Sequence, residues 1–157
     1  MIYSFLQNGD SAVTVQFKNE ISEEVNRRVT GLCNRIEAKH INGIIELVPT
    51  FASLTVFYDC TIISSKKLKK KIKSLINGGE CDVKSTAKVW NIPVCYDDEF
   101  ALDMKNVCSH TALEKEEVIK LHTSKPYLIY MLGFLPGFAY LGGMDERLFT
   151  PRLKTPR

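Results

Sequence analysis

Residues 133–143 read GFLPGFAYLGG and directly follow an apolar run, PYLIYML, at 126–132. Four glycines and one proline in these eleven residues exclude a regular helix or a central strand. Three aromatic residues, Phe134, Phe138 and Tyr140, lie among them. Apolar side chains favour burial, whereas loops run over the surface. Two interpretations remain: a loop that folds over a pocket walled by aromatic rings, or a tight, buried corner of the chain.

The segments on either side of this loop carry their own signals. Residues 127–132 are apolar at successive positions, so we expect a strand that is buried on both faces. Residues 144–149 are expected to form one helical turn. The triplet Thr-Pro-Arg then occurs twice, at 150–152 and 155–157. Its arginines, Arg152 and Arg157, can clamp a carboxylate or a phosphate, and the alternative is a solvated, extended tail.

The N-terminal half shows alternating strand and helix periodicities. Strands are expected at 2–6, 13–17, 44–48 and 51–58. One helix is expected from Ser22 to about His40, and a second from Ser64 or Ser65 to the glycines that follow residue 77. Their apolar faces consist of Val25, Val29, Leu32 and Ile36, and of Leu68, Ile72, Leu75 and Ile76. The order predicts an α+β fold over 1–79: a small antiparallel ββαββα sandwich with both helices on one sheet face.

The C-terminal half is less regular. Residues 80–87 are expected to be a linker, and 88–157 a second domain. A strand is predicted over 88–95, where Pro93 favours an edge or a bulge. A helical segment is predicted over 100–107, then a capping box from Thr111 to Glu114 and a helix ending near His122. His122 is either a general base or a hydrogen-bonded structural histidine beneath the loop.

Composition limits the functional classes. Hydrophobic residues make up 45% of the chain and charged residues 25%, which is typical of globular proteins. The net charge of +3 does not by itself indicate nucleic-acid binding. No apolar run is long enough to span a bilayer, and no signal peptide is recognisable. Five cysteines without a C-x-x-C pair favour reduced thiols in the cytoplasm and no metal site.

Two further features allow more than one interpretation. Six lysines between Lys66 and Lys73 form either a basic patch for nucleic acid or an acidic partner, or a solvated helix face. The second half offers too few strands for a sheet that is stable alone. We therefore expect that a partner completes it or that the chain is a fragment of a longer protein.

Several motifs together carry a family resemblance. The loop sequence at 132–143, followed by Asp145, Arg147-Leu148 and the two Thr-Pro-Arg units, resembles the signature of the family of 5-oxoprolinase B subunits. That family is also called KipI or allophanate hydrolase subunit 1, and it is similar to part of the carboxyltransferase domain of urea carboxylase. Weaker matches cover the rest of the chain: GDSA at 9–12, ELVP at 46–49, SLTV at 53–56, YD at 58–59, IPVCY at 92–96 and EEVI at 116–119.

The resemblance implies a fold and an activity. It implies an N-terminal α+β domain followed by a cyclophilin-like β-barrel, which is incomplete here because members run on through further strands. It implies a cytoplasmic subunit of an ATP-dependent amidase that opens the lactam of 5-oxo-L-proline to L-glutamate. ATP would be a co-substrate, with magnesium, although no G-x-x-x-x-G-K loop is present. Partners would be a related C subunit and a separate A subunit, and this chain alone is expected to be inactive.

The resemblance also implies roles for residues near the loop. Catalytic candidates are His122, Arg152 and Arg157, and substrate-binding candidates are Phe134, Pro136, Gly137, Phe138 and Tyr140. Neither a nucleic acid nor a membrane is an expected partner. The alternative function is regulatory: some members resemble inhibitors of a sensor histidine kinase, a role that needs an exposed apolar surface on the second domain.

Overall fold

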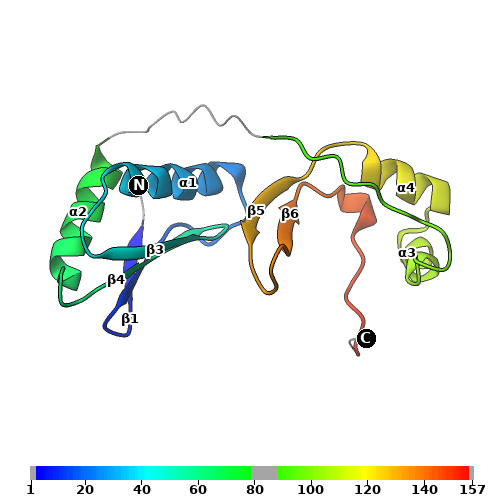
Figure 1. The fold of residues 1–157 in the computed structure, drawn as a ribbon. Helices are drawn as coiled ribbons and strands as arrows, with labels where there is room; N and C mark the ends of the chain where they lie inside the picture. The colour runs from blue at the N-terminus through cyan, green and yellow to red at the C-terminus, as the bar shows by residue number, and fades with distance from the viewer. Residues whose placement is uncertain (1–2, 79–87, 156–157) are drawn as a thin grey trace. The chain divides into compact units, whose positions relative to one another are not determined.

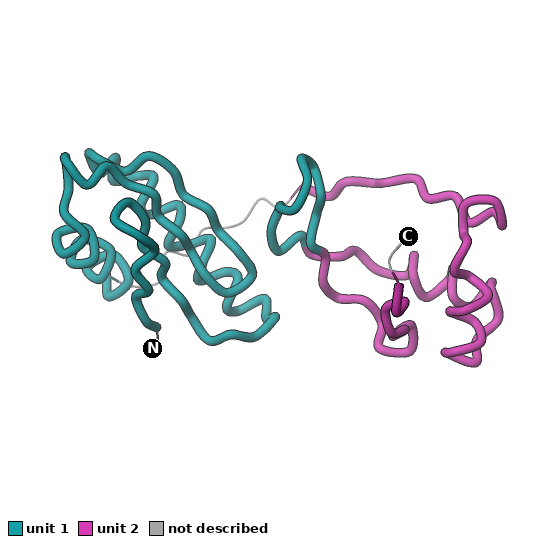
Figure 2. Tube along the Cα trace, turned by 90° about the horizontal axis from the view of Figure 1, so that it is seen from below, with its two compact units in different colours: residues 1–85, 129–140 teal, residues 86–128, 141–157 magenta. Residues whose placement is uncertain are grey.

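The computed structural model describes residues 3–78 and 88–155, and the chain divides into two compact units (Figure 2). Unit 1 comprises residues 1–85 and 129–140, and unit 2 comprises residues 86–128 and 141–157. The expected linker at 80–87 and the expected site residue Arg157 lie outside the described residues. The predicted domain boundaries at 79 and 88 stay a prediction.

The N-terminal part of unit 1 has the element order that its sequence predicts (Figure 1). All neighbouring strands pair antiparallel, in the spatial order β1-β2-β4-β3. The α+β prediction with antiparallel strands is therefore confirmed for this part. The elements are β1 (Ser4–Asn8), β2 (Ala12–Gln16), α1 (Glu23–Ala38), β3 (Ile44–Pro49), β4 (Ser53–Tyr58) and α2 (Ser65–Asn77).

One hydrophobic core joins both helices to one face of this sheet. The predicted apolar face of α1 is buried, as are Leu68, Ile72 and Ile76 of α2. Val13 and Val56 are register partners and both are fully buried, so they face the helices together. Each fully buried aliphatic side chain contributes about 1.5–3 kcal/mol relative to exposure. Ser22 and Ser64 cap the two helices as predicted.

The remaining elements are short. They are α3 (Met104–Thr111), α4 (Lys115–Thr123), β5 (Leu128–Leu132), β6 (Ala139–Gly142) and the 3₁₀ turn η1 (Glu146–Leu148). The predicted capping box at Thr111–Glu114 is wrong by one turn. Ala112 has a left-handed φ of 56° and ends α3, and the box forms between Glu114 and Glu117 at the start of α4.

Two strand predictions differ from the structure. Residues 88–96 form no strand, and Val89, Trp90 and Ile92 are 64–75% exposed. Pro93 has no N–H to donate, and no described strand pairs with this segment. The expectation that β5 is buried on both faces is also wrong, since Ile129 is 45% and Leu132 62% exposed. Within the described chain, β5 pairs only with β6, in a two-stranded sheet.

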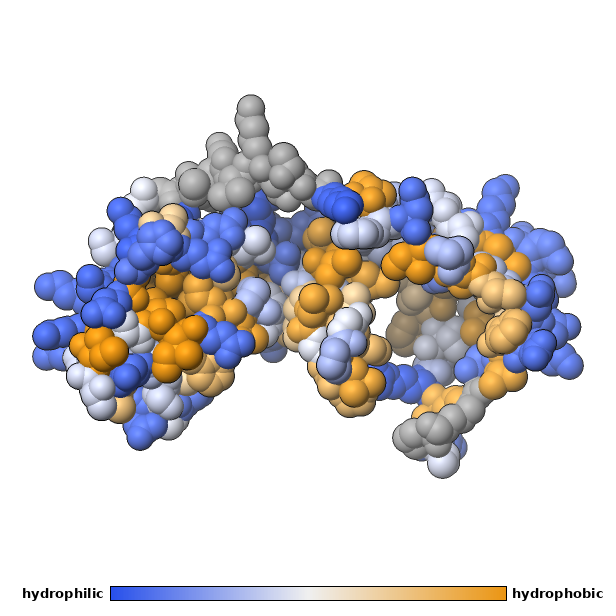
Figure 3. Space-filling model, in the orientation of Figure 1, coloured by the Kyte–Doolittle hydropathy of each residue, from blue (hydrophilic) through white to orange (hydrophobic). Residues whose placement is uncertain are grey.

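Unit 2 has little core of its own. Among its described residues, Val118 and Leu148 are the only buried hydrophobic ones, and apolar side chains lie on its surface (Figure 3). The described strands of the second half form a two-stranded sheet and no closed barrel, so the cyclophilin-like barrel stays a prediction. Within 3–78 and 88–155, no helix has the length and apolar character that crossing a bilayer requires. Cys33, Cys60, Cys95 and Cys108 are free thiols, and Cys81 lies outside the described residues.

Candidate functional site

The loop between β5 and β6 closes with local backbone hydrogen bonds. The Gly133 N–H donates to the Phe138 carbonyl over 3.1 Å, and the Phe138 N–H donates to the Leu135 carbonyl over 3.0 Å. Pro136 and Gly137 occupy the two central positions of the turn from Leu135 to Phe138. Gly137 has φ +77°, which is the value that a type II turn demands of its third residue. The sequence Leu-Pro-Gly-Phe thus encodes this tight, solvent-facing turn.

Three aromatic rings lie in sequence along this hairpin, and we call them the aromatic ladder: Phe134, Phe138 and Tyr140. The Phe134 and Phe138 centroids are 5.7 Å apart, and those of Phe138 and Tyr140 are 5.2 Å apart. Both pairs meet edge to face, at 72° and 73°, which is a favourable geometry. The rings are 82%, 45% and 43% exposed in chain order. The rings are not buried among the described residues, so the buried-corner interpretation is wrong, and the pocket interpretation stays a prediction.

The glycines of the hairpin serve different purposes. A Cβ added to Gly133 would lie 3.6 Å from Cε2 of Tyr140, so Tyr140 already packs closely on this part of the backbone. A Cβ on Gly137 would meet nothing within 4 Å, so only its positive φ calls for glycine. Phe134 also has a positive φ, of 70°, which is uncommon for a residue with a side chain. That conformation accompanies the most exposed ring of the ladder.

A buried amide anchors the hairpin within unit 1. Asn26 on α1 is 8% exposed, and its Nδ2 donates to the backbone carbonyl of Tyr130 in β5 over 3.1 Å. The same group donates to the carbonyl of Thr50 over 3.4 Å. The Asn26 side chain thereby donates to two backbone carbonyls, those of Tyr130 and Thr50. No role for Asn26 is predicted from the sequence. The one sequence signal for it is that a polar residue stands beside the apolar stripe of α1.

His122 lies in unit 2 between two tyrosines. Its Nδ1 is 2.5 Å from the hydroxyl of Tyr96, and its backbone carbonyl accepts a hydrogen bond of 2.9 Å from the hydroxyl of Tyr127. Both rings contact the imidazole, with centroids 5.9 Å and 5.6 Å away. Burial, then the neighbouring Tyr96 and Asp145, raise the pKa of Tyr127 above its ordinary value, which keeps its hydroxyl a donor. These contacts suit the structural interpretation of His122, and its catalytic role stays a prediction.

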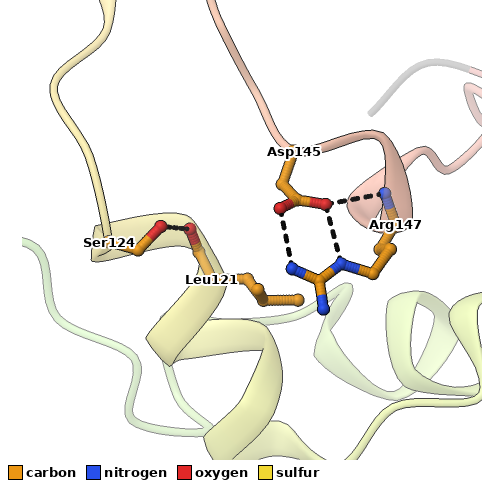
Figure 4. A network of polar contacts seen from close by, with 4 residues as sticks. All are labelled: Leu121, Ser124, Asp145 and Arg147. Atoms are coloured by element: carbon orange, nitrogen blue, oxygen red, sulfur yellow. Dashed lines mark hydrogen bonds and ion pairs between the residues drawn. The ribbon is translucent and has the colours of Figure 1, made fainter.

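A second polar group fixes the segment after β6. The guanidinium of Arg147 binds the carboxylate of Asp145 in a bidentate manner, with N–O distances of 3.0 Å and 2.9 Å (Figure 4). Asp145 also accepts from the Arg147 backbone N–H at the start of η1. The hydrogen bonds to Arg147 lower the pKa of Asp145 to about 2. The guanidinium of Arg147 is therefore paired with Asp145, and the Asp145 carboxyl is ionised at neutral pH.

Arg152 lies on the exposed segment that follows η1, in unit 2. It forms no ion pair within 4 Å with any residue in 3–78 or 88–155. Both the clamp and the solvated-tail interpretations of Arg152 therefore remain open. The five predicted substrate-binding residues lie together on the hairpin of unit 1, and His122 and Arg152 lie in unit 2. No group of three or more potential metal ligands occurs among the described residues.

Unit 2 also has an open apolar groove of about 660 Å³. Its walls come from the segments 94–96 and 100–103, from α3 and α4, and from Leu153. Phe100 and Leu102 line it and are 64% and 68% exposed. Hydrophobic residues with this exposure are typical of a surface that another polypeptide covers.

Comparisons with known proteins extend over almost the whole chain. A sequence model described as "Carboxyltransferase domain, subdomain C and D" matches residues 3–157. A curated protein of Bacillus subtilis, which is named as the B subunit of 5-oxoprolinase, is 40% identical over 166 aligned residues. The alignment covers 99% of this chain and 69% of that protein.

Two solved structures resemble the fold. The crystal structure of TTHA0988 matches with a TM-score of 0.78 and 32% identity, over 93% of this chain and 28% of that chain. Kluyveromyces lactis urea carboxylase matches with a TM-score of 0.64 and 18% identity, over 83% of this chain and 14% of that chain. The chain thus spans about two thirds of the curated relative and a much smaller part of these solved structures.

Proposed function

The chain belongs to the family of carboxyltransferase domains with subdomains C and D, and from this premise we propose that it is the B-type subunit of an ATP-dependent 5-oxoprolinase. The observation that carries the proposal is the 40% identity to a 5-oxoprolinase B subunit over 99% of this chain. The hairpin with the aromatic ladder lies inside the matched region. Its three rings are exposed, which supports a role in ligand binding.

The proposed reaction is the opening of 5-oxo-L-proline to L-glutamate with hydrolysis of ATP. A lactam resists hydrolysis because its nitrogen donates electron density into the carbonyl. Transfer of the γ-phosphoryl group of ATP to the carbonyl oxygen, with release of ADP, would make the carbon electrophilic, and water would then add to it. The C–N bond would break as the nitrogen takes up a proton, and a second water would hydrolyse the resulting acyl phosphate to L-glutamate and phosphate. Magnesium bound with ATP would offset part of the phosphate charge. The phosphoryl group needs cationic stabilisers. Arg152 and Arg157 are proposed for this role, the second of them outside the described residues.

The aromatic ladder is proposed to bind the small ring of the substrate. Phe138 offers a ring face between its two neighbours, and the hydroxyl of Tyr140 can donate a hydrogen bond. Pro136 and Gly137 form an exposed tip with open space around the Gly137 Cα, which admits a ligand close to the backbone. His122 is proposed as the general base, with the structural role as its alternative.

Unit 2 is proposed to be part of a cyclophilin-like barrel, with a related C subunit and an A subunit as partners. The scarcity of buried hydrophobic residues in its described part supports this proposal. A unit with so little core gains stability only by burying its apolar surface against further polypeptide. On this account the chain by itself is inactive.

The test is co-expression of the protein with C-type and A-type subunits, followed by an assay of 5-oxoproline-dependent ATP hydrolysis. We expect activity in the assembly, and a loss of at least tenfold for Arg152→Ala if Arg152 stabilises the phosphoryl group, as removal of one such donor costs about 10²–10³ in rate. Lys154→Ala is the matched control, because it removes a nearby exposed cation. Equal activity of both variants contradicts the role of Arg152, and no activity in any assembly contradicts the proposed function.

A regulatory function is the second candidate, and the open apolar groove of unit 2 favours it. A kinase inhibitor would use this groove to bind a kinase dimerisation domain. Tight binding to such a domain, together with inactive assemblies, would replace the enzyme proposal.

A further inference from the structure

Helix α2 carries an uncompensated positive charge. Its six lysines are Lys66, Lys67, Lys69, Lys70, Lys71 and Lys73, and the helix contains no acidic residue. Within 3–78 and 88–155, none of these lysines forms an ion pair within 4 Å. Hydrophilic side chains project around α2 in Figure 3. A helix face with so many lysines and no counter-charge attracts anionic partners.

Three of these lysines line a groove along strand β1. Lys69, Lys70 and Lys73 form one wall of an open groove of about 470 Å³, and Tyr3, Ser4 and Phe5 form the other. At the opposite end of β1, the hydroxyl of Ser65 donates to Oε1 of Gln7 over 2.6 Å. The start of α2 therefore lies beside the end of β1, and its later turns lie beside the start of β1. Helix and strand run alongside each other in opposite directions.

Strand β1 also has an open backbone edge. It is the outermost strand in the order β1-β2-β4-β3, and no other described strand pairs with it. Alternate residues of such a strand present their N–H and C=O groups to solvent, which makes the edge a template for another strand. Leu6, in the middle of β1, is 48% exposed. The lysine-lined groove and the open edge thus occur at the same strand.

We propose that β1 is the docking edge for an extended, acidic segment of a partner protein. The segment adds to the sheet as a fifth strand, and its carboxylates lie opposite Lys69, Lys70 and Lys73. Side chains on one face of a strand repeat every ~6.6–6.8 Å. Lysines one helical turn apart, such as Lys69 and Lys73, repeat about every 5.4–6 Å along the helix axis. Acidic residues at alternate positions therefore match these lysines over a short segment.

The structure favours a peptide over a nucleic acid as the occupant. The rings of Tyr3 and Phe5 pack against the hydrophobic core and contact each other edge to face, with centroids 5.7 Å apart. Rings held in this way are not free to stack on bases, which single-stranded nucleic acids require. A nucleic acid also has no main-chain amides to pair with β1.

The experiment measures binding of a fluorescent peptide, in which glutamate alternates with valine, to the whole chain by anisotropy. The test variant is Lys70→Gln/Lys73→Gln, and the control is Lys67→Gln/Lys71→Gln, which removes the same charge from lysines of α2 that do not line the groove. We expect the test variant to bind about fivefold more weakly and the control to bind within twofold of the unchanged protein. Equal weakening by both variants overturns the proposal, because binding then depends on diffuse charge only.

Three further probes separate edge pairing from simple charge attraction. A peptide of the same composition with its glutamates grouped at one end should bind at least fivefold more weakly. Of two peptides methylated at alternate backbone nitrogens, one at the even and one at the odd positions, the one whose methyl groups face β1 should bind at least fivefold more weakly than the other. The amide resonances of β1 should shift on binding of the alternating peptide. The proposal is overturned if both methylated peptides bind as tightly as the unmethylated one. It is also overturned if a single-stranded oligonucleotide binds more tightly than the alternating peptide. These outcomes do not depend on 5-oxoprolinase activity.

Discussion

Asn26 and Tyr130 are 104 positions apart in the sequence, yet the side-chain amide of Asn26 donates a hydrogen bond of 3.1 Å to the Tyr130 carbonyl. This partly buried contact attaches β5, and with it the aromatic ladder, to helix α1. The proposed ligand-contacting hairpin is therefore positioned by a residue of the N-terminal sandwich.

Substitution of Asn26 should loosen the hairpin. Asn26→Leu leaves the carbonyls of Tyr130 and Thr50 without this donor, and an unsatisfied buried acceptor costs about 1–3 kcal/mol. We expect Asn26→Leu to speed amide hydrogen exchange in β5 and β6 relative to the unchanged protein. Exchange in β2 and β4 should change less. Asn34→Leu, at a half-buried position of the same helix, should leave the hairpin amides unchanged. Unchanged exchange in Asn26→Leu would contradict the anchoring role.

Two glycines should respond to alanine in opposite directions. Gly43 has φ +94°, and an added Cβ would lie 2.7 Å from Cγ2 of the buried Ile63. Gly43→Ala should lower the free energy of unfolding by about 1–3 kcal/mol. Gly31 lies inside α1, and an added Cβ would meet nothing within 4 Å. Gly31→Ala should raise that free energy by about 0.5–1 kcal/mol, because glycine destabilises a helix interior. Urea unfolding of both variants checks the pair.

The ion pair between Asp145 and Arg147 should give a pH-dependent contribution to stability. Its hydrogen bonds lower the pKa of Asp145 to about 2 in the folded chain, against about 3.9 in an unfolded chain. The contribution is therefore fully present above about pH 4–5 and is lost as the pH falls towards 2. Asp145→Asn should melt at a lower temperature than the unchanged protein at pH 7, and the difference should shrink between pH 4 and pH 2.

The neighbouring Glu146→Gln provides the control for that titration. It removes one negative charge from the same turn but leaves the bidentate pair intact. A difference in melting temperature that persists unchanged at pH 2 for Asp145→Asn would show that the low pKa of Asp145 does not contribute to folding.

Tyr96 and His122 should be energetically coupled. Because their side chains share a hydrogen bond, the destabilisations of Tyr96→Phe and His122→Ala should add up to more than that of the double variant. The coupling should be about 0.5–1.5 kcal/mol, the net worth of one hydrogen bond. The same cycle with His110→Ala in place of His122→Ala should be additive. An additive result for the Tyr96–His122 cycle would instead leave His122 free for a catalytic role.

Much of unit 1 can be predicted from its sequence, because the apolar residues that recur at helix or strand spacing pack against each other inside the unit. Val25, Val29, Leu32 and Ile36 recur at helical spacing, and all four are buried. Leu54, Val56 and Tyr58 alternate along β4 and are buried as expected. In such segments local pattern and tertiary packing agree.

The second half could not be predicted equally well, for physical reasons. The apolar runs at 88–95 and 127–132 indicate strands of a larger sheet, and the described chain supplies only the β5–β6 pair. The capping-box pattern fits Thr111–Glu114, whereas the left-handed Ala112 ends α3 there and the box forms at Glu114–Glu117. At the candidate site, the loop aromatics could be identified from the sequence. The hydrogen bond from Asn26 and the tyrosines around His122 depend on tertiary contacts that no local pattern reveals.

The central claim is that the aromatic ladder binds the lactam substrate of a 5-oxoprolinase. Its most direct test is the dependence of ATP hydrolysis on 5-oxoproline concentration in assemblies that carry Phe138→Ala or the control Phe57→Ala. Phe57 is an aromatic residue on a strand with an exposed fraction of 38%, close to the 45% of Phe138. We predict that Phe138→Ala raises KM for 5-oxoproline by about tenfold, which corresponds to about 1.4 kcal/mol, whereas Phe57→Ala leaves KM unchanged. An unchanged KM and kcat in Phe138→Ala would contradict the claim.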